Sequence, residues 1–551
     1  MKIVIVGGVA GGASAAARAR RLSENAEIVL LERGKYVSFA NCGLPYYVGD
    51  EIQKREKLIV TSPQRLRERL RIDVRVCSKV VRIDRPNRKI HVVLSDTGES
   101  YTESYDRLIL SPGASPIRPE LPGRDLPNVL TLRTLEDVDR IRALVDRGMR
   151  SAIVVGAGFI GLEMVENLVR RGVKTTLVQL QNQVLSAMDR EMTAPLESQI
   201  LKHGVDLRLG QTLRSIEPSD QALLSAELTT GERIQSEMIL LGIGVRPENQ
   251  LAIDSGLSIG ERGGIVTNSF MQTSDPDIYA VGDAVEVEDF VMKSRAQIAL
   301  AGPANRQGRI AADHIFGRAM SYRGTQGTAI VRIFDSVAAT TGASERTLKK
   351  SNVKYQKIYI HPASHASYYP GASGMSIKLL FEEPSGRILG AQIVGGEGVD
   401  KRIDVIAMAI QGGMTVFDLE EAELAYAPQF GSAKDPINMA GFVAAGVLRG
   451  DHPVIHADQL IDNTIVCILD VRTEEEYTSG SIPGARNIPI DTLRSRLDEL
   501  PNDRQIITYC QVGQRGYLAT RILSQKGFQV RNLSGGFSTY RLFHPAVIPL
   551  G

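Results

Sequence analysis

The chain has 551 residues, which is enough for three or four domains of about 100–200 residues each. Its apolar content of 43% and charged content of 23% are typical of a soluble globular protein. The net charge of +2 gives no reason to expect a nucleic-acid or membrane partner, and no apolar run approaches the roughly 20 residues of a membrane-spanning helix. The four cysteines show no metal-ligand spacing, so no metal site is expected, and their sparse use predicts a reducing, cytoplasmic location.

The N-terminal segment has the pattern of a nucleotide-binding unit. A short apolar strand is expected over Lys2–Val6, followed by a glycine turn, a helix, and a second strand over Glu27–Leu31. In such a βαβ unit the turn lets a pyrophosphate approach backbone N–H groups at the helix N-terminus, and an acid after the second strand binds ribose hydroxyls. Valine replaces the usual middle glycine of the turn. The residues expected to bind a dinucleotide here are Gly7, Val9, Ala10, Gly11, Glu32 and Arg33.

Two distant segments fit this unit as partners. A strand expected over Ile278–Val281 ends in Gly282-Asp283, where an acid can hydrogen-bond the ribityl chain of a flavin. The segment Leu108–Pro116 contributes Ser111 and Gly113. Together these segments resemble the flavin domain of the pyridine nucleotide–disulfide oxidoreductases, a family whose FAD domain is split around an inserted NAD(P)H domain.

The insert carries a second nucleotide motif. After a strand expected over Ser151–Val155 comes a complete G-x-G-x-x-G and a helix; the residues expected to bind the nucleotide are Gly156, Gly158, Phe159, Ile160, Gly161 and Glu163. The segment Gln179–Gln183 at the end of the next strand holds neither the acid typical of NADH sites nor the cations typical of NADPH sites. Because this segment offers no Lys or Arg to bind a 2′-phosphate, NADH is favoured over NADPH. The ring of Phe159 either covers the flavin as a gate or packs behind the helix.

A lone cysteine, Cys42, follows the first unit in the stretch SFANCGLPYY. Backbone donors of a loop that opens into a helix are expected to favour its thiolate. With the glycine turn and the later HASYYPG, this stretch resembles the single-cysteine branch of the family, which includes coenzyme A disulfide reductases, NADH oxidases and NADH peroxidases. The CoA disulfide reductases fit best, over Met1–Gly446, through the matching residues Ser38, Phe39, Asn41 and Cys42, the run Ala425–Pro428, and Lys434-Asp435.

This resemblance implies a specific chemistry. The cysteine of the subgroup holds CoA as a mixed disulfide, and two tyrosines of the dimer partner reach the sulfurs; they match Tyr368 and Tyr426, with Tyr369 as the alternative to the first. Arg18 and Arg21, spaced i,i+3, share a helix face that can bind the phosphates of CoA. The full set expected to bind CoA is Ser14, Arg18, Arg21, Ser38, Asn41, Asn305 and Lys434. Leu70 stands where the subgroup can have lysine, and Arg69 or Arg71 is a possible substitute.

The last 95 residues or so are expected to form a small separate α/β unit, which follows a linker at Arg449–Pro453. A buried strand ends at Tyr509, Cys510 opens a loop, and a helix starts near Arg515. With Asp470-Val471-Arg472 and Leu533–Gly536, this pattern resembles a rhodanese domain, whose loop cysteine carries a persulfide. Loop amides and the helix dipole favour an anionic sulfur there; the expected loop residues after the cysteine are Gln511, Val512, Gly513, Gln514 and Arg515.

The predicted fold class is α/β, with two Rossmann-like nucleotide-binding domains, an α+β dimerisation domain and a C-terminal rhodanese-like α/β domain. The expected domains are FAD-binding over 1–117 and 245–320, NAD(P)H-binding over 118–244, dimerisation over 321–447, a linker over 448–456, and rhodanese over 457–551.

The predicted function follows from the two nucleotide sites and the two loop cysteines. A homodimer with FAD, NAD(P)H and coenzyme A as cofactors is expected to reduce CoA disulfide, CoA or glutathione persulfide, or polysulfide at Cys42, with Cys510 handling sulfane sulfur. One alternative is an NADH oxidase or peroxidase that cycles Cys42 through a sulfenate. A second alternative is a redox or sulfide sensor in which the flavin domain only binds.

Overall fold

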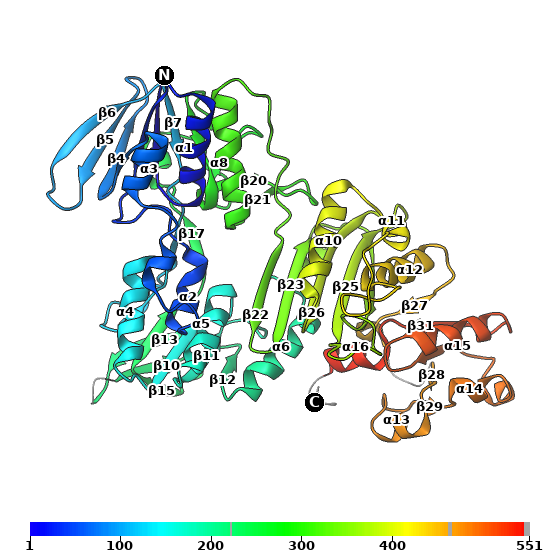
Figure 1. The fold of residues 1–551 in the computed structure, drawn as a ribbon. Coiled ribbons are helices and arrows are strands. Elements are labelled where there is room, and N and C mark those ends of the chain that lie inside the picture. Colours follow the sequence, from blue (N-terminus) through cyan, green and yellow to red (C-terminus); the bar gives the residue numbers. More distant parts are fainter. Residues whose placement is uncertain (221–222, 461–465, 545–551) are drawn as a thin grey trace. The chain divides into compact units, whose positions relative to one another are not determined.

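The computed structural model of the chain describes residues 1–220, 223–460 and 466–544, in two compact units (Figure 1). Unit 1 comprises residues 1–180 and 204–327, and unit 2 comprises residues 181–203 and the chain from residue 328 onwards. No helix within the described residues is both long and apolar enough to cross a membrane.

Unit 1 contains two five-stranded parallel sheets. The first has the order β19-β7-β1-β2-β3 and the bounds β1 Lys2–Val6, β2 Glu27–Leu31, β3 Asp73–Arg75, β7 Arg107–Leu110 and β19 Ile278–Ala280. The second has the order β12-β11-β10-β16-β9 and the bounds β9 Val129–Leu130, β10 Ser151–Val155, β11 Lys174–Gln179, β12 Asp206–Leu209 and β16 Met238–Leu241. Their central strands are buried apolar runs, as expected for parallel sheets that are covered on both faces.

Helices and small sheets complete unit 1. Its helices are α1 Ala10–Leu22, α2 Leu44–Val48, α3 Pro63–Leu70, α4 Leu135–Asp146, α5 Phe159–Arg170, α7 Gln250–Asp254 and α8 Ala301–Ile315. Its remaining strands are β4 Ser78–Asp84, β5 Lys89–Leu94, β6 Ser100–Ser104, β8 Ala114–Pro116, β13 Leu213–Pro218, β14 Leu224–Leu228, β15 Arg233–Ser236, β17 Val245–Pro247, β18 Ile265–Val266, β20 Val285–Glu288 and β21 Arg295–Ala296. Helices α1 and α8 lie side by side (Figure 1), closely enough that a Cβ at Gly308 would lie 2.2 Å from the carbonyl oxygen of Gly11.

Unit 2 begins with an antiparallel sheet of order β22-β23-β26-β25-β24. Its strands are β22 Ala329–Ile333, β23 Ser336–Gly342, β24 Tyr355–Ile360, β25 Met375–Glu382 and β26 Ile388–Gly395. The helices of this part are α6 Arg190–Lys202, α9 Glu345–Lys350, α10 Val399–Gly412, α11 Val416–Glu421 and α12 Pro436–Leu448. Helix α6 comes from the range expected to bind the pyridine nucleotide, but it packs on β22, β23 and β26.

The C-terminal part of unit 2 is a parallel sheet of order β27-β31-β30-β28-β29. Its strands are β27 Val454–Ile455, β28 Cys467–Asp470, β29 Arg486–Asn487, β30 Ile506–Tyr509 and β31 Val530–Leu533. The helices are α13 Glu474–Thr478, α14 Ile490–Leu493, α15 Gln514–Ser524 and α16 Gly536–Phe543. With the sheets of unit 1, this arrangement confirms the predicted α/β class.

Candidate active site

The first glycine turn, between β1 and α1, has the close backbone packing that a dinucleotide site needs. Gly7 has φ +98°, and a Cβ added to it would lie 2.0 Å from the carbonyl oxygen of Ser111. A Cβ at Gly12 would lie 1.9 Å from the carbonyl oxygen of Gly7. Only glycine fits these two positions. Val9 takes a negative φ of −95°, so this position does not require the left-handed conformation that favours glycine.

The acid predicted after β2 lies at this turn. The two carboxylate oxygens of Glu32 accept hydrogen bonds from the backbone N–H groups of Gly8 and Gly34, both at 2.8 Å. Its neighbour Arg33 is half exposed and pairs with Glu248 at 3.3 Å. The turn, the N-terminus of α1 and Glu32 therefore fit the nucleotide half of a flavin dinucleotide.

The second glycine turn repeats the design between β10 and α5. Gly156 has φ +101° and its Cβ would lie 2.4 Å from the carbonyl oxygen of Gly242, whereas a Cβ at Gly158 would meet nothing within 4 Å. That open space is where a pyrophosphate can approach the backbone. The side chain of Gln179, at the end of β11, accepts a hydrogen bond from the Ala157 N–H at 3.0 Å. Ile160, in the first turn of α5, is 40% exposed.

Cys42 lies in a single 3-10 turn, Asn41–Gly43, that leads into α2. The segment before it is tied to the first glycine turn, because the Ser38 N–H donates to the Gly8 carbonyl at 2.8 Å. Helix α2 is tied to the other nucleotide domain, because the Tyr46 hydroxyl donates to Glu163 of α5 at 3.0 Å. The segment around the cysteine is thus tied to the turn of the first nucleotide motif and to the helix of the second.

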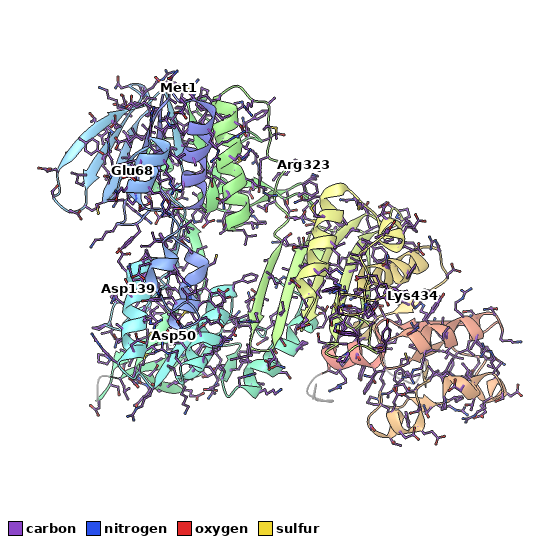
Figure 2. All side chains as sticks on the ribbon, viewed as in Figure 1. Met1, Asp50, Glu68, Asp139, Arg323 and Lys434 are labelled. Atoms are coloured by element: carbon purple, nitrogen blue, oxygen red, sulfur yellow. The ribbon has the colours of Figure 1, made fainter. Side chains whose placement is uncertain are left out.

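Further ion pairs of unit 1 hold the segment around this turn. Arg142 of α4 donates to Asp50 at 2.8 Å, and Arg55 binds Asp139 of α4 through several hydrogen bonds of 2.7–3.0 Å. Both acceptor residues, Asp50 and Asp139, are labelled in Figure 2. The short helix α2 therefore does not depend on its own five residues for its position.

The thiol of Cys42 has a strongly charged neighbourhood. Cys42 is exposed along one side, yet burial of the thiol and the carboxylates of Glu163 and Asp283 raise its pKa, while Arg133 acts in the opposite direction. Burial also raises the pKa of Glu163 and of Asp283, whose carboxylate lies 3.6 Å from Arg133. The sequence predicted a thiolate favoured by backbone donors; in the folded chain, burial and the two acids outweigh the contribution of the backbone.

The residues expected to bind CoA divide into two groups. In unit 1, Arg18 donates to Asp313 of α8 at 2.6 and 2.9 Å, so its charge is already paired, and Arg21 is exposed. The hydroxyl of Ser14 donates to the side-chain oxygen of Asn305. In unit 2, Lys434 is exposed just before α12 (Figure 2).

Unit 2 carries the two expected tyrosines, and the fold brings them together. The hydroxyls of Tyr368 and Tyr426 lie 2.8 Å apart, and the residues are 74% and 48% exposed. Their hydrogen bond raises the pKa of Tyr368. Tyr369 instead contacts the ring of His365 edge-on, so the hydroxyl pair involves Tyr368 and not its neighbour.

The second candidate site is the loop after β30. The Gly513 N–H donates to the Sγ atom of Cys510 at 3.2 Å, and Gly513 takes φ +98°, which favours glycine. Arg515 forms two hydrogen bonds with Glu476, at 2.7 and 2.6 Å, and this pairing holds the pKa of Glu476 at about 2. Cys510 itself is buried, and a cavity of about 340 Å³ opens beside the loop at Gln511.

Comparison with known proteins identifies this architecture. Residues 1–308 match the family model for pyridine nucleotide-disulphide oxidoreductases, and residues 328–435 match the dimerisation domain of the same family. The chain belongs to the pyridine nucleotide-disulphide oxidoreductase family. Residues 455–542 match the rhodanese-like domain. The predicted flavoprotein oxidoreductase with a C-terminal rhodanese domain is thereby confirmed.

Three relatives of this oxidoreductase are informative. A coenzyme A disulfide reductase of Staphylococcus epidermidis is 35% identical over 445 residues, which are 80% of this chain and 99% of the relative. The crystal structure of reduced Bacillus anthracis CoADR-RHD is 48% identical with a TM-score of 0.96, covering 99% of this chain and 98% of that one. A NAD-dependent persulfide reductase from A. fulgidus is 35% identical with a TM-score of 0.91, covering 98% and 100%.

Two features of the oxidoreductase lie outside every sequence motif. One is Arg133, in the loop before α4, whose guanidinium lies 3.6 Å from the Asp283 carboxylate and lowers the pKa of Cys42. Its signal in the sequence is weak, since it merely precedes the capping box of Thr134 and Asp137 at the start of α4.

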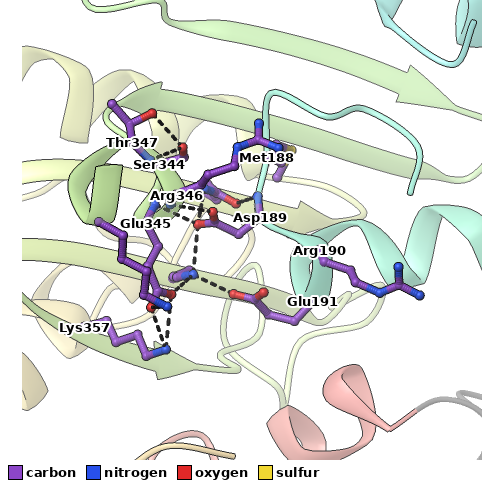
Figure 3. A network of polar contacts seen from close by, with 12 residues as sticks. Met188, Asp189, Arg190, Glu191, Ser344, Glu345, Arg346, Thr347 and Lys357 are labelled. Atoms are coloured by element: carbon purple, nitrogen blue, oxygen red, sulfur yellow. Dashed lines mark hydrogen bonds and ion pairs between the residues drawn. The ribbon is translucent and has the colours of Figure 1, made fainter. Parts of the chain in front are cut away.

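The other is a buried cluster of three carboxylates in unit 2: Asp189, Glu191 and Glu345 (Figure 3). The geometry would suit a metal ion, but the Lys378 ammonium lies 2.8, 2.6 and 2.6 Å from the three carboxylates. The ammonium group of Lys378 compensates the negative charge of the carboxylates, as a metal ion would, so we interpret the cluster as a structural ion network.

Proposed function

We propose that this oxidoreductase uses NADH and FAD to reduce CoA disulfide or a CoA persulfide through Cys42, and that Cys510 carries sulfane sulfur. The observation that supports it most is the position of Cys42 in the turn Asn41–Gly43, because hydrogen bonds of the flanking residues Ser38 and Tyr46 tie this turn to both nucleotide-binding motifs. Cys42 is a free thiol, and the next cysteine in the chain is Cys77. Cys42 therefore suits a bond with a sulfur that comes from a substrate.

Coenzyme A is proposed as the thiol because of the relatives and the cations of this chain. One relative is a coenzyme A disulfide reductase and another is a persulfide reductase. Arg21 and Lys434 are exposed and can bind phosphate. Arg18, being paired with Asp313, contributes less than the sequence suggested. Glutathione persulfide and polysulfide remain further candidates of the same chemical class.

The chemistry balances with one nucleotide per disulfide. The Cys42 thiolate attacks one sulfur of CoA disulfide; a Cys42–S–S–CoA bond forms and the other CoA leaves as a thiolate. The first glycine turn, Glu32 and Asp283 would hold FAD, which would supply a two-electron route from the NADH hydride to sulfur. Breaking the mixed disulfide with two electrons and one proton returns Cys42 as a thiolate and releases the second CoA as a thiol. With a CoA persulfide, the released product is hydrosulfide in place of one CoA.

Arg133 and the tyrosine pair have proposed roles in these steps. Arg133 stabilises the Cys42 thiolate, because it is the group that lowers the pKa of this thiol most. Tyr368 and Tyr426 of the partner subunit donate a hydrogen bond or proton to the departing sulfur. The homodimer that this requires is supported by the dimerisation domain and by its exposed apolar side chains, which include Met408, Phe430 and Phe442.

Cys510 is proposed as the sulfur carrier. A donor such as thiosulfate passes its outer sulfur to the Cys510 thiolate and leaves as sulfite. A thiol acceptor then attacks the outer sulfur of the persulfide and leaves with it, which restores Cys510. The Gly513 N–H, which donates to the Sγ atom of Cys510 at 3.2 Å, supports this role. The free cysteines of the chain support the expected reducing, cytoplasmic setting.

The test is Cys42→Ser, with Cys77→Ser as a matched control in the same unit. Cys42→Ser should still bind FAD and let NADH reduce it, but NADH consumption with CoA disulfide should fall by orders of magnitude, because serine cannot form the mixed disulfide. Cys77→Ser should turn over normally. Substantial turnover in Cys42→Ser would sink the mechanism. An oxidase or peroxidase would instead show NADH-dependent loss of oxygen or peroxide at a rate similar to that with CoA disulfide.

A further inference from the structure

One face of β24, the edge strand of the antiparallel sheet in unit 2, is polar throughout. Because strand residues alternate between faces, Tyr355, Lys357 and Tyr359 point the same way, and His361 follows in the same register. The first of these donates to Glu345 within the dimerisation domain, at 2.8 Å. The other three contact the rhodanese domain.

Hydrogen bonds of 2.7–3.0 Å join this strand and His361 to the rhodanese domain. The Nε2 atom of His361 lies 2.7 Å from the Thr539 hydroxyl of α16, and the backbone N–H of Tyr359 donates to the Ser534 hydroxyl at 3.0 Å. Lys357 donates to Asp458 at 2.9 Å. A Cβ added to Gly535 would lie 2.9 Å from the Cβ of Tyr359, so this glycine allows the two backbones to approach.

The segment that β24 contacts is also the segment that supports the Cys510 loop. The Phe537 N–H at the start of α16 donates to the Cys510 carbonyl at 2.8 Å, and the Ser538 N–H donates to the Gln511 carbonyl at 2.9 Å. A Cβ at Gly536 would lie 2.2 Å from the Cys510 carbonyl oxygen. The first turn of α16 therefore lies between the sulfur-carrying loop and the dimerisation domain.

On the dimerisation-domain side, further hydrogen bonds hold the residues of this contact. His361 forms a second hydrogen bond, between its Nδ1 atom and the Ser376 hydroxyl, at 2.9 Å. The Tyr359 hydroxyl donates to Glu191 at 2.8 Å, and this carboxylate belongs to the Lys378 network shown in Figure 3. Because the side chains of His361 and Tyr359 are themselves held by hydrogen bonds, they can keep the neighbouring loop close to the geometry that the reaction needs.

We propose that His361 is a positioning residue for the rhodanese reaction, acting through Thr539 and the first turn of α16 to hold the Cys510 loop in its reactive geometry. The sulfur-transfer site is thus completed by the dimerisation domain, outside the range that matches the rhodanese family. The inference rests on the proposed role of Cys510.

The test compares His361→Ala, Thr539→Val and the double variant in the full-length, FAD-loaded protein. The assay is sulfur transfer from thiosulfate to cyanide, which gives sulfite and thiocyanate. Each single variant should lower kcat about tenfold, because small displacements of reacting groups cost that much or more. KM for thiosulfate should stay unchanged. The double variant should be no slower than either single variant, since both remove one interaction. His361→Gln, whose amide can bond Thr539, should recover part of kcat.

The matched control is Tyr355→Phe, which removes one hydroxyl from the same face of the same strand without touching α16. It should leave kcat at the parent value. An equal loss in Tyr355→Phe, or losses in the two single variants that multiply in the double variant, would overturn the inference.

A second readout does not need Cys510 chemistry. Amide exchange in residues 510–517 should accelerate in His361→Ala and Thr539→Val but not in Tyr355→Phe, and unchanged exchange in both would overturn it as well. If the parent protein transfers sulfur no faster than Cys510→Ser, the proposed role of Cys510 is wrong. The amide-exchange measurement then decides whether His361 holds the loop.

Discussion

Replacing Gln179 with glutamate should increase the preference for NADH over NADPH. The side-chain oxygen of Gln179 accepts from the Ala157 N–H at 3.0 Å, and the amide NH₂ group of the same side chain is a second polar group at the end of β11. That group is a neutral donor, which can bond either a ribose hydroxyl or a 2′-phosphate. In the glutamate variant, whose side chain has the same length, one carboxylate oxygen can keep the bond to Ala157 while the other presents an anionic acceptor to the ribose.

The size of the effect follows from two terms. A hydrogen bond to a charged group contributes about 1 kcal/mol more than a neutral one. A carboxylate about 5 Å from one phosphate charge, at an effective dielectric constant of about 40, repels it by about 1.7 kcal/mol. Together they give about 2.7 kcal/mol, or roughly 100-fold in the ratio of NADH to NADPH efficiency.

The assay is stopped-flow reduction of the bound flavin by each nucleotide, with kcat/KM compared between parent and variant. Gln235→Glu, on the separate sheet of β13, β14 and β15, adds the same charge to the same unit and should leave the ratio unchanged. A ratio that stays constant in Gln179→Glu, or that moves toward NADPH, would refute this interpretation of the Gln179 geometry.

The remaining predictions concern the two sulfur sites and the linker between domains. Tyr426→Phe should slow the reduction of the disulfide by about 10²–10⁴-fold while sparing flavin reduction by NADH, and stopped-flow traces with both halves unchanged would make the tyrosine structural. Arg133→Met should raise the pKa of Cys42 further, so the rising limb of the kcat/KM profile should move to higher pH; a shift to lower pH would contradict the proposed role. Cys510→Ser should abolish thiosulfate sulfur transfer but keep NADH-dependent reduction of CoA disulfide near the parent rate, and loss of both would place Cys510 in the reductive site. Burial lowers the pKa of His452 to about 4 and of His456 to about 3, so between pH 6.5 and these values the unfolded chain binds protons that the folded chain does not. Thermal stability of the C-terminal domain should therefore fall as pH drops through that window, and a melting temperature that stays constant from pH 7 to 4 would contradict the burial of these rings.

The glycine turns could be predicted from the sequence because their constraint is local. A residue such as Gly7 or Gly156 must take a positive φ and pass close to another backbone, and only glycine does so without strain. The strands that flank them are short apolar runs, and the structure places β1, β2 and β10 at the predicted residues.

The charges of the site could not be predicted in the same way. The sequence shows two arginines on one helix face, but only the fold brings Asp313 against Arg18. Arg133, whose charge lowers the pKa of the cysteine, lies in a loop that carries no nucleotide motif. The choice between Tyr368 and Tyr369 depends on which hydroxyl meets Tyr426, and that is set by the backbone of a loop.

The most direct test of the account is the mass of the Cys42 peptide after the full-length protein has met CoA disulfide. We expect one CoA on Cys42 through a disulfide, released as free CoA thiol by one equivalent of NADH, and no adduct on the same peptide of Cys42→Ser. A peptide that carries only an added oxygen, or a CoA adduct that NADH does not release, would contradict the claim that Cys42 is the site of reductive CoA chemistry.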